Sequence, residues 1–179
     1  MIPAGQFYFG SSGGDPMKGF GEKNNEPVTL PVYCIDYFEY PNKSGAMPRA
    51  NVGYAGAESA CKKAGKRLCS EEEWEKACKG PGGLRYPYGN KWDPALCNSE
   101  DDQGNKKEVG AAGAFPKCRS GYGIADLSGN VAEWVAGGSI NKGGSADKPN
   151  YAVRCAAKTK ADPGKSSPTL GFRCCADTD

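Results

Sequence analysis

Nine cysteines in a chain of 179 residues constrain this sequence more than any other feature. No two of them have the CxxC spacing of zinc knuckles and thioredoxin-type redox motifs. The chain has no histidine, which excludes imidazole-based zinc sites, Ser-His-Asp and Cys-His catalysis, and the two-His-one-carboxylate iron site. We therefore expect a disulfide-bonded protein of extracellular, periplasmic or cell-surface location, with an odd cysteine left over.

Length and composition narrow the class of protein further. The chain is long enough for one ordinary domain, so we expect a single domain over residues 1–179. Its 26 glycines and 13 prolines predict many loops and limited regular structure. Positive and negative side chains are interspersed, with a formal net charge of +2, so nucleic acid is not an expected partner. No apolar run is long enough to span a bilayer, and no signal peptide is visible.

Only a few segments show the hydrophobic pattern of a strand or a helix clearly. Residues 2–9 and 28–40 are typical of strands, with Pro31 marking an edge or a bulge. Residues 54–64 have helical spacing, and a second helix is expected to begin with a capping box between Ser70 and Glu73.

The tail, residues 141–175, contains three short strand-like pieces and three of the nine cysteines. The partners of these cysteines must come from earlier segments. We therefore expect the tail to supply central strands onto which the rest of the chain is linked.

Several motifs occur in the order of one protein family and extend over nearly the whole chain. Among them are Ile2-Pro3-Ala4-Gly5-Gln6-Phe7, Gly65-Lys66-Arg67-Leu68, Glu72-Glu73-Trp74-Glu75, Tyr86-Pro87-Tyr88-Gly89, Gly121-Tyr122-Gly123, Asp126-Leu127-Ser128-Gly129-Asn130-Val131-Ala132-Glu133-Trp134, Lys142-Gly143-Gly144-Ser145, Arg154-Cys155-Ala156-Ala157 and Gly171-Phe172-Arg173-Cys174. Each is weak alone, but together the sequence resembles the formylglycine-generating enzyme (sulfatase-modifying factor) family. The resemblance implies an α+β fold, a C-type-lectin-like variant with two main helices around small twisted antiparallel sheets, many loops and disulfide bonds.

The resemblance also implies two disulfides, Cys61–Cys174 and Cys78–Cys155. In the chain-entropy model, a disulfide that closes a loop of about 100 residues stabilises the folded state by up to roughly 4–5 kcal/mol. Position and elimination then suggest two further pairs, Cys97–Cys118 and Cys34–Cys69, which leave Cys175 unpaired. A Cys34–Cys175 bridge is the alternative, and adjacent Cys174 and Cys175 should point to opposite faces of a strand.

Copper chemistry is not expected. The family's enzymes place two cysteines shortly after Gly-Gly-Ser, where soft thiolates bind copper(I) and activate oxygen. Here Ser145 is followed by residues 146–153 without a cysteine, and Ala132 stands where the enzymes have an aromatic residue. The long insertion that shapes the peptide groove is largely absent between residues 40 and 52. An iron-dependent relative would need histidines from elsewhere, so this chain could serve there only as an accessory part.

Calcium is the cofactor that the resemblance favours, because hard cations take oxygen ligands. The first implied site uses the side chains of Asp126 and Glu133 with the carbonyls of Gly129 and Val131. The competing interpretation is that the two carboxylates cap turns or pair with lysines.

A second implied calcium site would use Asn98 and the Ser99 carbonyl, with an acid from residues 101–102. The alignment of this loop is ambiguous.

Large aromatic and arginine side chains are expected to be structural. Trp74, Trp92 and Trp134 are predicted to be core residues, since large aromatics dominate core burial. Arg154 and Arg173 are predicted to be buried strand residues with hydrogen-bonded guanidinium groups.

The expected function is therefore that of a non-catalytic member of the family, which binds a protein or glycan ligand or an assembly partner. Its exposed loops would lie at residues 147–151 and 159–168, with Ser145, Asp147, Asn150 and Tyr151 as binding candidates. One alternative is the family's copper- and oxygen-dependent oxidase acting on sulfatase cysteines. Others are an enzyme that uses Ser145 with Cys175, and a structural subunit in which Cys175 links two chains.

Overall fold

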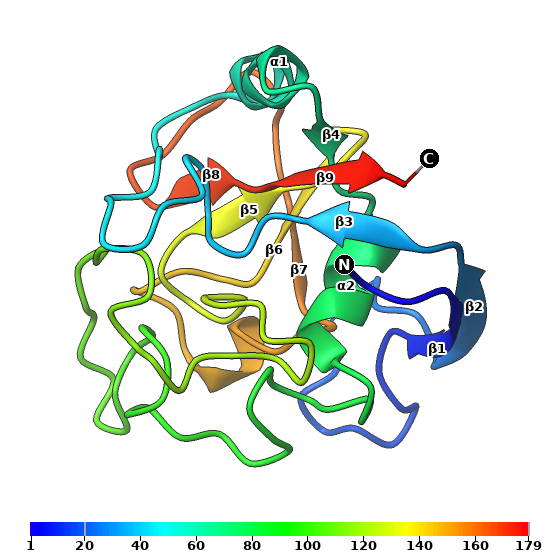
Figure 1. Cartoon of the computed structure of the whole chain (residues 1–179). Coiled ribbons are helices and arrows are strands. Elements are labelled where there is room, and N and C mark those ends of the chain that lie inside the picture. Colours follow the sequence, from blue (N-terminus) through cyan, green and yellow to red (C-terminus); the bar gives the residue numbers. More distant parts are fainter. Residues whose placement is uncertain (20, 179) are drawn as a thin grey trace.

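The computed structural model describes residues 1–19 and 21–178. Short strands and two helices are joined by long loops (Figure 1). The elements are β1 (Gly5–Phe9), β2 (Glu26–Leu30), β3 (Tyr33–Ile35), α1 (Tyr54–Lys63), β4 (Arg67–Leu68), α2 (Glu71–Lys79), β5 (Ala132–Trp134), β6 (Ile140–Lys142), η1 (Asn150–Ala152), β7 (Lys158–Lys160), β8 (Leu170–Phe172) and β9 (Cys174–Asp177).

Both helices begin where the sequence predicts. The Ser70 side chain accepts a hydrogen bond from the Glu73 amide, and the Glu73 carboxylate accepts one from the Ser70 amide at 2.8 Å. This capping box satisfies two of the amides that a helix start leaves free. Gly80 ends α2 with φ +63°, a conformation that favours glycine.

The strands form three small sheets with the orders β1-β2, β3-β9-β4 and β7-β6-β5-β8. All pairs are antiparallel except β5 and β8, which are parallel because the long tail crosses back before β8 begins. The predicted strand over residues 28–40 is interrupted at Pro31 into β2 and β3. In the tail, β6 and β9 are inner strands as expected, whereas β7 and β8 are sheet edges.

The core has two apolar clusters, one packed around each helix. Trp74 of α2 belongs to the first cluster with Tyr33 and Leu127, and Trp134 belongs to the second with Phe172. Trp74 and Trp134 are fully buried, as predicted for core residues, while Trp92 is only half-buried.

The chain has four disulfides, three of which link the tail to earlier segments, and one of these corrects the sequence-based pairing. The bonds are Cys61–Cys174, Cys69–Cys175, Cys78–Cys155 and Cys97–Cys118. The predicted Cys34–Cys69 bridge is wrong, and so is the alternative Cys34–Cys175.

The reason is the position of β9. It lies between β3 and β4, so it separates Cys34 of β3 from Cys69, which directly follows β4. Cys34 pairs in register with Ala176, whereas Cys175 lies opposite Arg67 of β4, two residues before Cys69. Cys34 is the free cysteine, and Cys175, inside a disulfide, is not available as a catalytic thiol or a link between chains.

A buried ionic cluster joins β5, α2 and the segment between β8 and β9. The Arg173 guanidinium, fully buried between β8 and β9, donates to both carboxylate oxygens of Glu133 at 2.7 Å. The Trp74 indole donates to the same carboxylate at 2.6 Å. Beside this pair, Glu39 is fully buried and accepts a hydrogen bond from Asn130 on one oxygen. Among the described residues the other oxygen of Glu39 has no partner.

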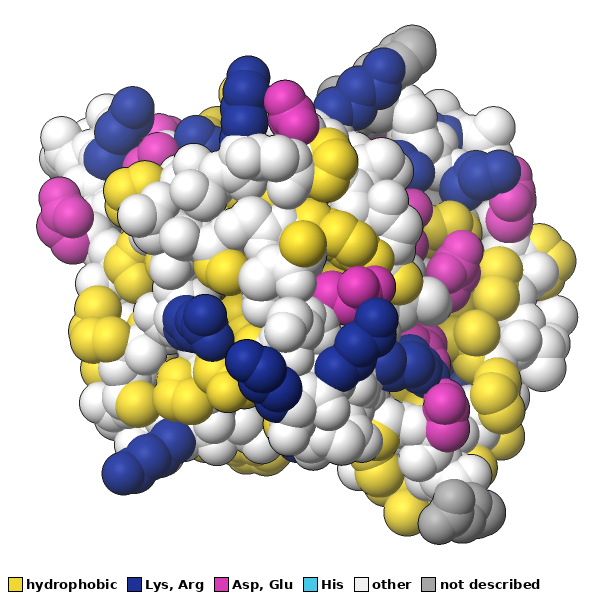
Figure 2. Space-filling model, turned by 90° about the horizontal axis from the view of Figure 1, so that it is seen from above, with side chains coloured by type: hydrophobic (Ala, Val, Ile, Leu, Met, Phe, Trp, Pro, Cys, Tyr) yellow, Lys and Arg dark blue, Asp and Glu magenta, His cyan; other side chains and the backbone are white. Residues whose placement is uncertain are grey.

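The outer face of α1 carries much of the positive charge seen from above the molecule. Lys62 and Lys63 in its last turn are exposed, and Lys62 pairs with Glu58 at 3.1 Å. Figure 2 shows a band of basic side chains on this face with acidic side chains beside it. None of the described helices is long and apolar enough to cross a membrane.

The revised pairing predicts unequal effects of cysteine substitution. Because Cys69–Cys175 closes a separation of 106 residues, the Cys69→Ala/Cys175→Ala variant should lose about 2–4 kcal/mol of unfolding free energy. Cys34→Ala should change it by less than about 1 kcal/mol. Urea unfolding measures both effects. A peptide map of unreduced protein that links Cys34 to Cys69 would contradict the assignment.

The buried carboxyl of Glu39 predicts a pH dependence of stability. Burial, reinforced by the negative charge of Asp126, raises the pKa of Glu39 to about 8, whereas the unfolded carboxyl titrates near 4.3. Between these values the folded chain holds a proton that the unfolded chain has lost, so stability falls as pH rises from about 5 to 8. Each tenfold difference in proton affinity is worth about 1.4 kcal/mol.

Glu39→Gln should therefore flatten this pH dependence and be more stable than the wild type above pH 8. Denaturant unfolding at pH 5, 7 and 9 measures the difference. Glu108→Gln, at an exposed glutamate, is the matched control and should follow the wild type. An unchanged slope in Glu39→Gln would show that other groups cause the dependence.

Candidate functional site

The tail forms a small cavity, which we call the tail pocket and which is lined by polar side chains together with Ala132, Ala152 and Leu170. Its volume is about 200 Å³, and its lining includes Asn141, Ser145, Lys148, Thr159, Ser167 and Thr169. Strands β5, β6, β7 and β8 and the short helix η1 all contribute to it. The lining offers hydroxyl and amide groups together with one ammonium group at its exposed edge.

Two glycines bring the backbone to this pocket. Gly143 has φ +84°, and a Cβ there would stand 3.0 Å from the ring of Trp74. Gly144 has φ +61°, and its Cβ would lie 2.7 Å from the Ala152 carbonyl oxygen. A larger residue would fit neither the dihedral angle nor the space. The Gly-Gly-Ser motif therefore holds β6 against α2 and η1 and places Ser145 at the pocket wall.

Of the predicted binding candidates, only Ser145 lines the tail pocket, while Asp147, Asn150 and Tyr151 follow it in the chain, in the segment that leads into η1. Ser145 is buried and its hydroxyl donates to Asp147 at 2.6 Å. Although partial burial alone raises the pKa of Asp147, hydrogen bonds from Ser145 and Lys148 lower it below the ordinary value. Asn150 is half-buried and its carbonyl accepts a hydrogen bond from the Tyr86 hydroxyl, which fixes η1.

Tyr151 is the exposed member of this set, with 57% of its surface accessible. Its carbonyl accepts a hydrogen bond from Arg154 at 2.9 Å, so the backbone is fixed while the ring faces solvent. A rigid backbone with an exposed aromatic ring beside a polar pocket is suited to recognition.

No thiol lies at the tail pocket. All nine cysteines are within the described residues, eight of them form disulfides, and Cys34 belongs to β3 in a different sheet. The pair that most resembles a nucleophile with its base is Ser145 with Asp147. A carboxylate with a lowered pKa is a weak base, so this pair holds the hydroxyl in place without activating it strongly.

The residues of the first expected calcium site do not present free carboxylates. Both oxygens of Glu133 are engaged by Arg173, and one of them also by Trp74. Asp126, with φ +58°, accepts the Gly113 amide at 2.7 Å. The adjacent guanidinium of Arg173 would repel a divalent cation. As arranged here, these side chains do not fit calcium.

The residues of the second expected calcium site form an internal hydrogen-bond network. The Asn98 amide donates to the Glu108 carbonyl and to Asn130, each at 2.9 Å. The Ser99 hydroxyl points to a neighbouring carbonyl. Asp101 closes its own loop, and hydrogen bonds from Asn105 lower its pKa.

Within the part of the chain that the structure describes, no three Asp, Glu or Cys side chains are grouped to hold a metal ion. Calcium binding therefore stays a prediction from the family resemblance, and the positions of Glu133 and Arg173 argue against it.

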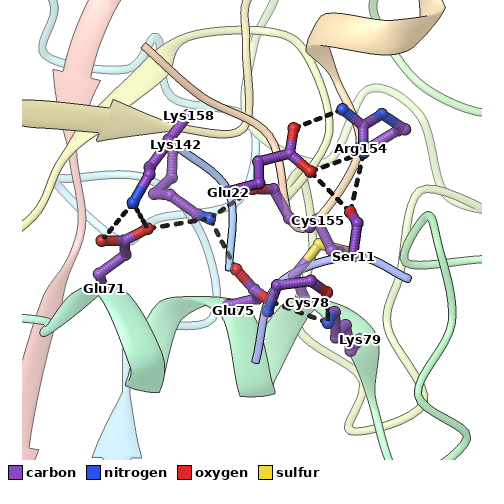
Figure 3. Close-up of polar contacts among 12 residues, drawn as sticks. Ser11, Glu22, Glu71, Glu75, Cys78, Lys79, Lys142, Arg154, Cys155 and Lys158 are labelled. Atoms are coloured by element: carbon purple, nitrogen blue, oxygen red, sulfur yellow. Dashed lines mark hydrogen bonds and ion pairs between the residues drawn. A yellow bond between two sulfur atoms is a disulfide. The ribbon is translucent and has the colours of Figure 1, made fainter. Parts of the chain in front are cut away.

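A second network of buried charges supports the tail pocket, and the sequence did not reveal it (Figure 3). Lys142, which precedes the two glycines, is buried and pairs with Glu75 of α2 at 2.8 Å. Glu75 also pairs with Lys79 one turn later. Burial opposes ionisation of Glu75, but the two lysines lower its pKa below the ordinary value. In a sequence, charged residues of a helix are normally predicted to face solvent, so the burial of this network could not be predicted.

Arg154 forms the other half of this network. Its guanidinium donates to Glu22 at 2.6 Å and to the Ser11 hydroxyl at 3.1 Å, linking the tail to the N-terminal loop. Arg154 and Arg173 are both buried with hydrogen-bonded guanidinium groups, as predicted, but neither is a strand residue, because Arg154 follows η1 and Arg173 lies between β8 and β9.

Comparison with known proteins identifies the family. The sulfatase-modifying factor enzyme 1-like domain matches residues 40–178. The inactive C-alpha-formylglycine-generating enzyme 2 of Bos taurus is 36% identical over 152 residues, which cover 72% of this chain and 50% of that protein. The formylglycine-generating enzyme of Mus musculus is 33% identical over 168 residues, covering 73% of this chain and 44% of that protein. The chain thus spans about half the length of the curated relatives it matches.

Among solved structures, PvdO from Pseudomonas aeruginosa superposes with a TM-score of 0.81 over 98% of this chain and 92% of that one. Its sequence is 20% identical, so this likeness concerns the fold alone. The two helices, the small sheets and the disulfides are those of a C-type-lectin-like variant. The chain therefore belongs to the formylglycine-generating enzyme family, the sulfatase-modifying factor enzyme 1-like domains.

Proposed function

We propose that this chain is a non-catalytic family member that binds a segment of a partner protein at the tail pocket. The observation that carries the proposal is the lining of the pocket, where Ser145, Asn141 and Lys148 stand and no thiol is present. Copper(I) needs soft thiolate ligands, and hydroxyl, amide and ammonium groups do not replace them. The same groups are suited to hydrogen bonding with a polar peptide.

The exposed ring of Tyr151 supports the choice of a protein partner. It lies next to Asn150 on η1, whose Ala152 lines the pocket. Exposed tyrosines on rigid backbone are frequent anchors of protein interfaces, with polar groups around them. Lys148 at the edge, with its side chain about half accessible, would favour an acidic residue in the partner.

Four disulfides support an oxidising compartment as the place of action. Such bonds persist outside cells, in the periplasm and in secretory compartments, and they are rare in the cytosol. The proposal therefore places the chain in an extracellular, periplasmic or cell-surface setting. The relative described as inactive is consistent with a family in which some members keep the fold without the catalytic activity.

The proposal predicts that copper will not turn this chain into an oxidase. Copper(I) and oxygen, supplied with a peptide carrying the sulfatase cysteine motif, should yield no formylglycine by mass spectrometry. The formylglycine-generating enzyme of Mus musculus serves as the positive control. Tight copper(I) binding through a thiolate, or conversion of the peptide, would contradict a non-catalytic role.

The tail pocket itself is tested by selection from a phage-displayed peptide library. Peptides selected by the wild type should bind the Lys148→Glu/Tyr151→Ala variant at least about tenfold more weakly, a loss of about 1.4 kcal/mol. Lys165→Glu is the matched control, because its side chain is exposed and it does not line the pocket. Equal binding by both variants would place the interaction elsewhere on the surface.

A further inference from the structure

A second cavity lies at the C-terminal end of α2 and shares no lining residue with the tail pocket. It has two adjoining compartments of about 390 Å³ and 170 Å³, which share Asn25, Lys79 and Gly83. We call it the hairpin groove, because β1 and the loop after it form one wall. Its larger compartment falls within the range of about 300–1,000 Å³ that is typical of small-molecule sites.

The charged side chains that line the hairpin groove are already paired within the protein. Lys79 donates to the carbonyls of Tyr8 and Gly10 at 2.6 and 2.5 Å and pairs with Glu75 at 2.8 Å, which uses its three protons. Figure 3 shows this lysine directed toward Glu75.

The other charges are balanced in the same way. Arg154 donates to Glu22, to Ser11 and to a backbone carbonyl. Arg85 and Asp15 pair with each other at 3.2 Å. With Lys79, these complete the charged residues of the lining. The groove therefore offers no uncompensated charge, and its ligand should be uncharged.

Neutral hydrogen-bonding groups are what remains available. Among the described residues, the side-chain amides of Gln6 and Asn25 have no hydrogen-bond partner, and Asn90 uses only its oxygen, on the Arg85 amide. Each free amide group can both donate and accept, as the hydroxyls of a polar neutral ligand require.

Aromatic side chains line the larger compartment. They are the half-buried Phe7 and Tyr122 and the exposed Tyr8, which is 61% accessible. Because side chains alternate along a strand, the ring of Tyr8 lies on the same face of β1 as the side-chain amide of Gln6, and Phe7 lies on the other face. The floor is a run of backbone from residues 80 to 83, where a Cβ on Gly83 would meet no atom within 4 Å. Backbone peptide groups therefore lie close to the space that a ligand would occupy.

We propose that the hairpin groove binds a neutral oligosaccharide. A pyranose ring has an apolar face that can stack on an aromatic ring and a rim of hydroxyls that pair with amides, so it matches both kinds of lining. Two adjoining compartments fit at least two linked sugar units. A peptide is the other class of ligand. Its backbone could pair with the same amides, but it would make less use of the aromatic rings than a sugar does.

The experiment is an NMR titration of ¹⁵N-labelled protein with maltotetraose, cellotetraose, chitotetraose and mannotetraose in separate samples. At least one should give saturable shifts at the amides of residues 6–8, 25 and 80–83, with a dissociation constant on the order of a millimolar or tighter. The Gln6→Ala/Tyr8→Ala variant changes two exposed residues and should bind at least about tenfold more weakly.

Tyr37→Ala, at an exposed tyrosine that lines neither the groove nor the tail pocket, is the matched control and should bind like the wild type. The proposal is overturned if none of the four sugars gives saturable shifts, if the shifts centre on Ser145 and Thr169, or if Gln6→Ala/Tyr8→Ala binds unchanged. It is also overturned if a pool of random decapeptides shifts the groove amides and the sugars do not. These outcomes are independent of the peptide selection at the tail pocket.

Discussion

The fully buried pair of Arg173 and Glu133 is the interaction on which most of the fold depends. Arg173 lies between β8 and β9, Glu133 lies in β5, and the carboxylate also accepts the Trp74 indole of α2. The same guanidinium donates to the carbonyls of Asp36 and Ala125. Removing one partner of such a pair typically costs about 3–5 kcal/mol, because the other charge is left buried without compensation. The pair connects two sheets, a helix and two loops in a single network.

A chain so rich in glycine has little regular backbone structure to organise it, and covalent and ionic links take over part of that role. Three of the four disulfides join a cysteine between residues 61 and 78 to the tail. The ion pair of Lys142 with Glu75 joins the same regions through side chains, and that of Arg154 with Glu22 joins the tail to the N-terminal loop. Apolar burial then needs to be only local, which is consistent with two modest clusters in place of one large core.

Sequence reasoning succeeded where the signal is local. The capping box at Ser70 follows from backbone chemistry and is present, and at Pro31, where the sequence indicated an edge or a bulge, the strand is interrupted. The Cys34–Cys69 error arose because pairing depends on which strand separates two others. The order β3-β9-β4 cannot be read from residues far apart in the chain. The buried carboxylates of Glu39 and Glu75 were missed for a related reason, since a glutamate gives no sign in sequence that its partner is a distant lysine or amide.

The tail pocket shows which parts of the family fold are fixed by packing and which are not. Gly143 and Gly144 are required by contacts to Trp74 and Ala152, which are demands of packing alone. The residues after Ser145 face fewer such demands, since Lys148 is exposed and Asp147 and Asn150 are half-buried. A substitution there changes what the pocket presents without loosening β6 or α2. The proposed non-catalytic binding role needs such a segment, because hydroxyl and amide groups can replace thiolates there at little cost in stability while the frame around them stays rigid.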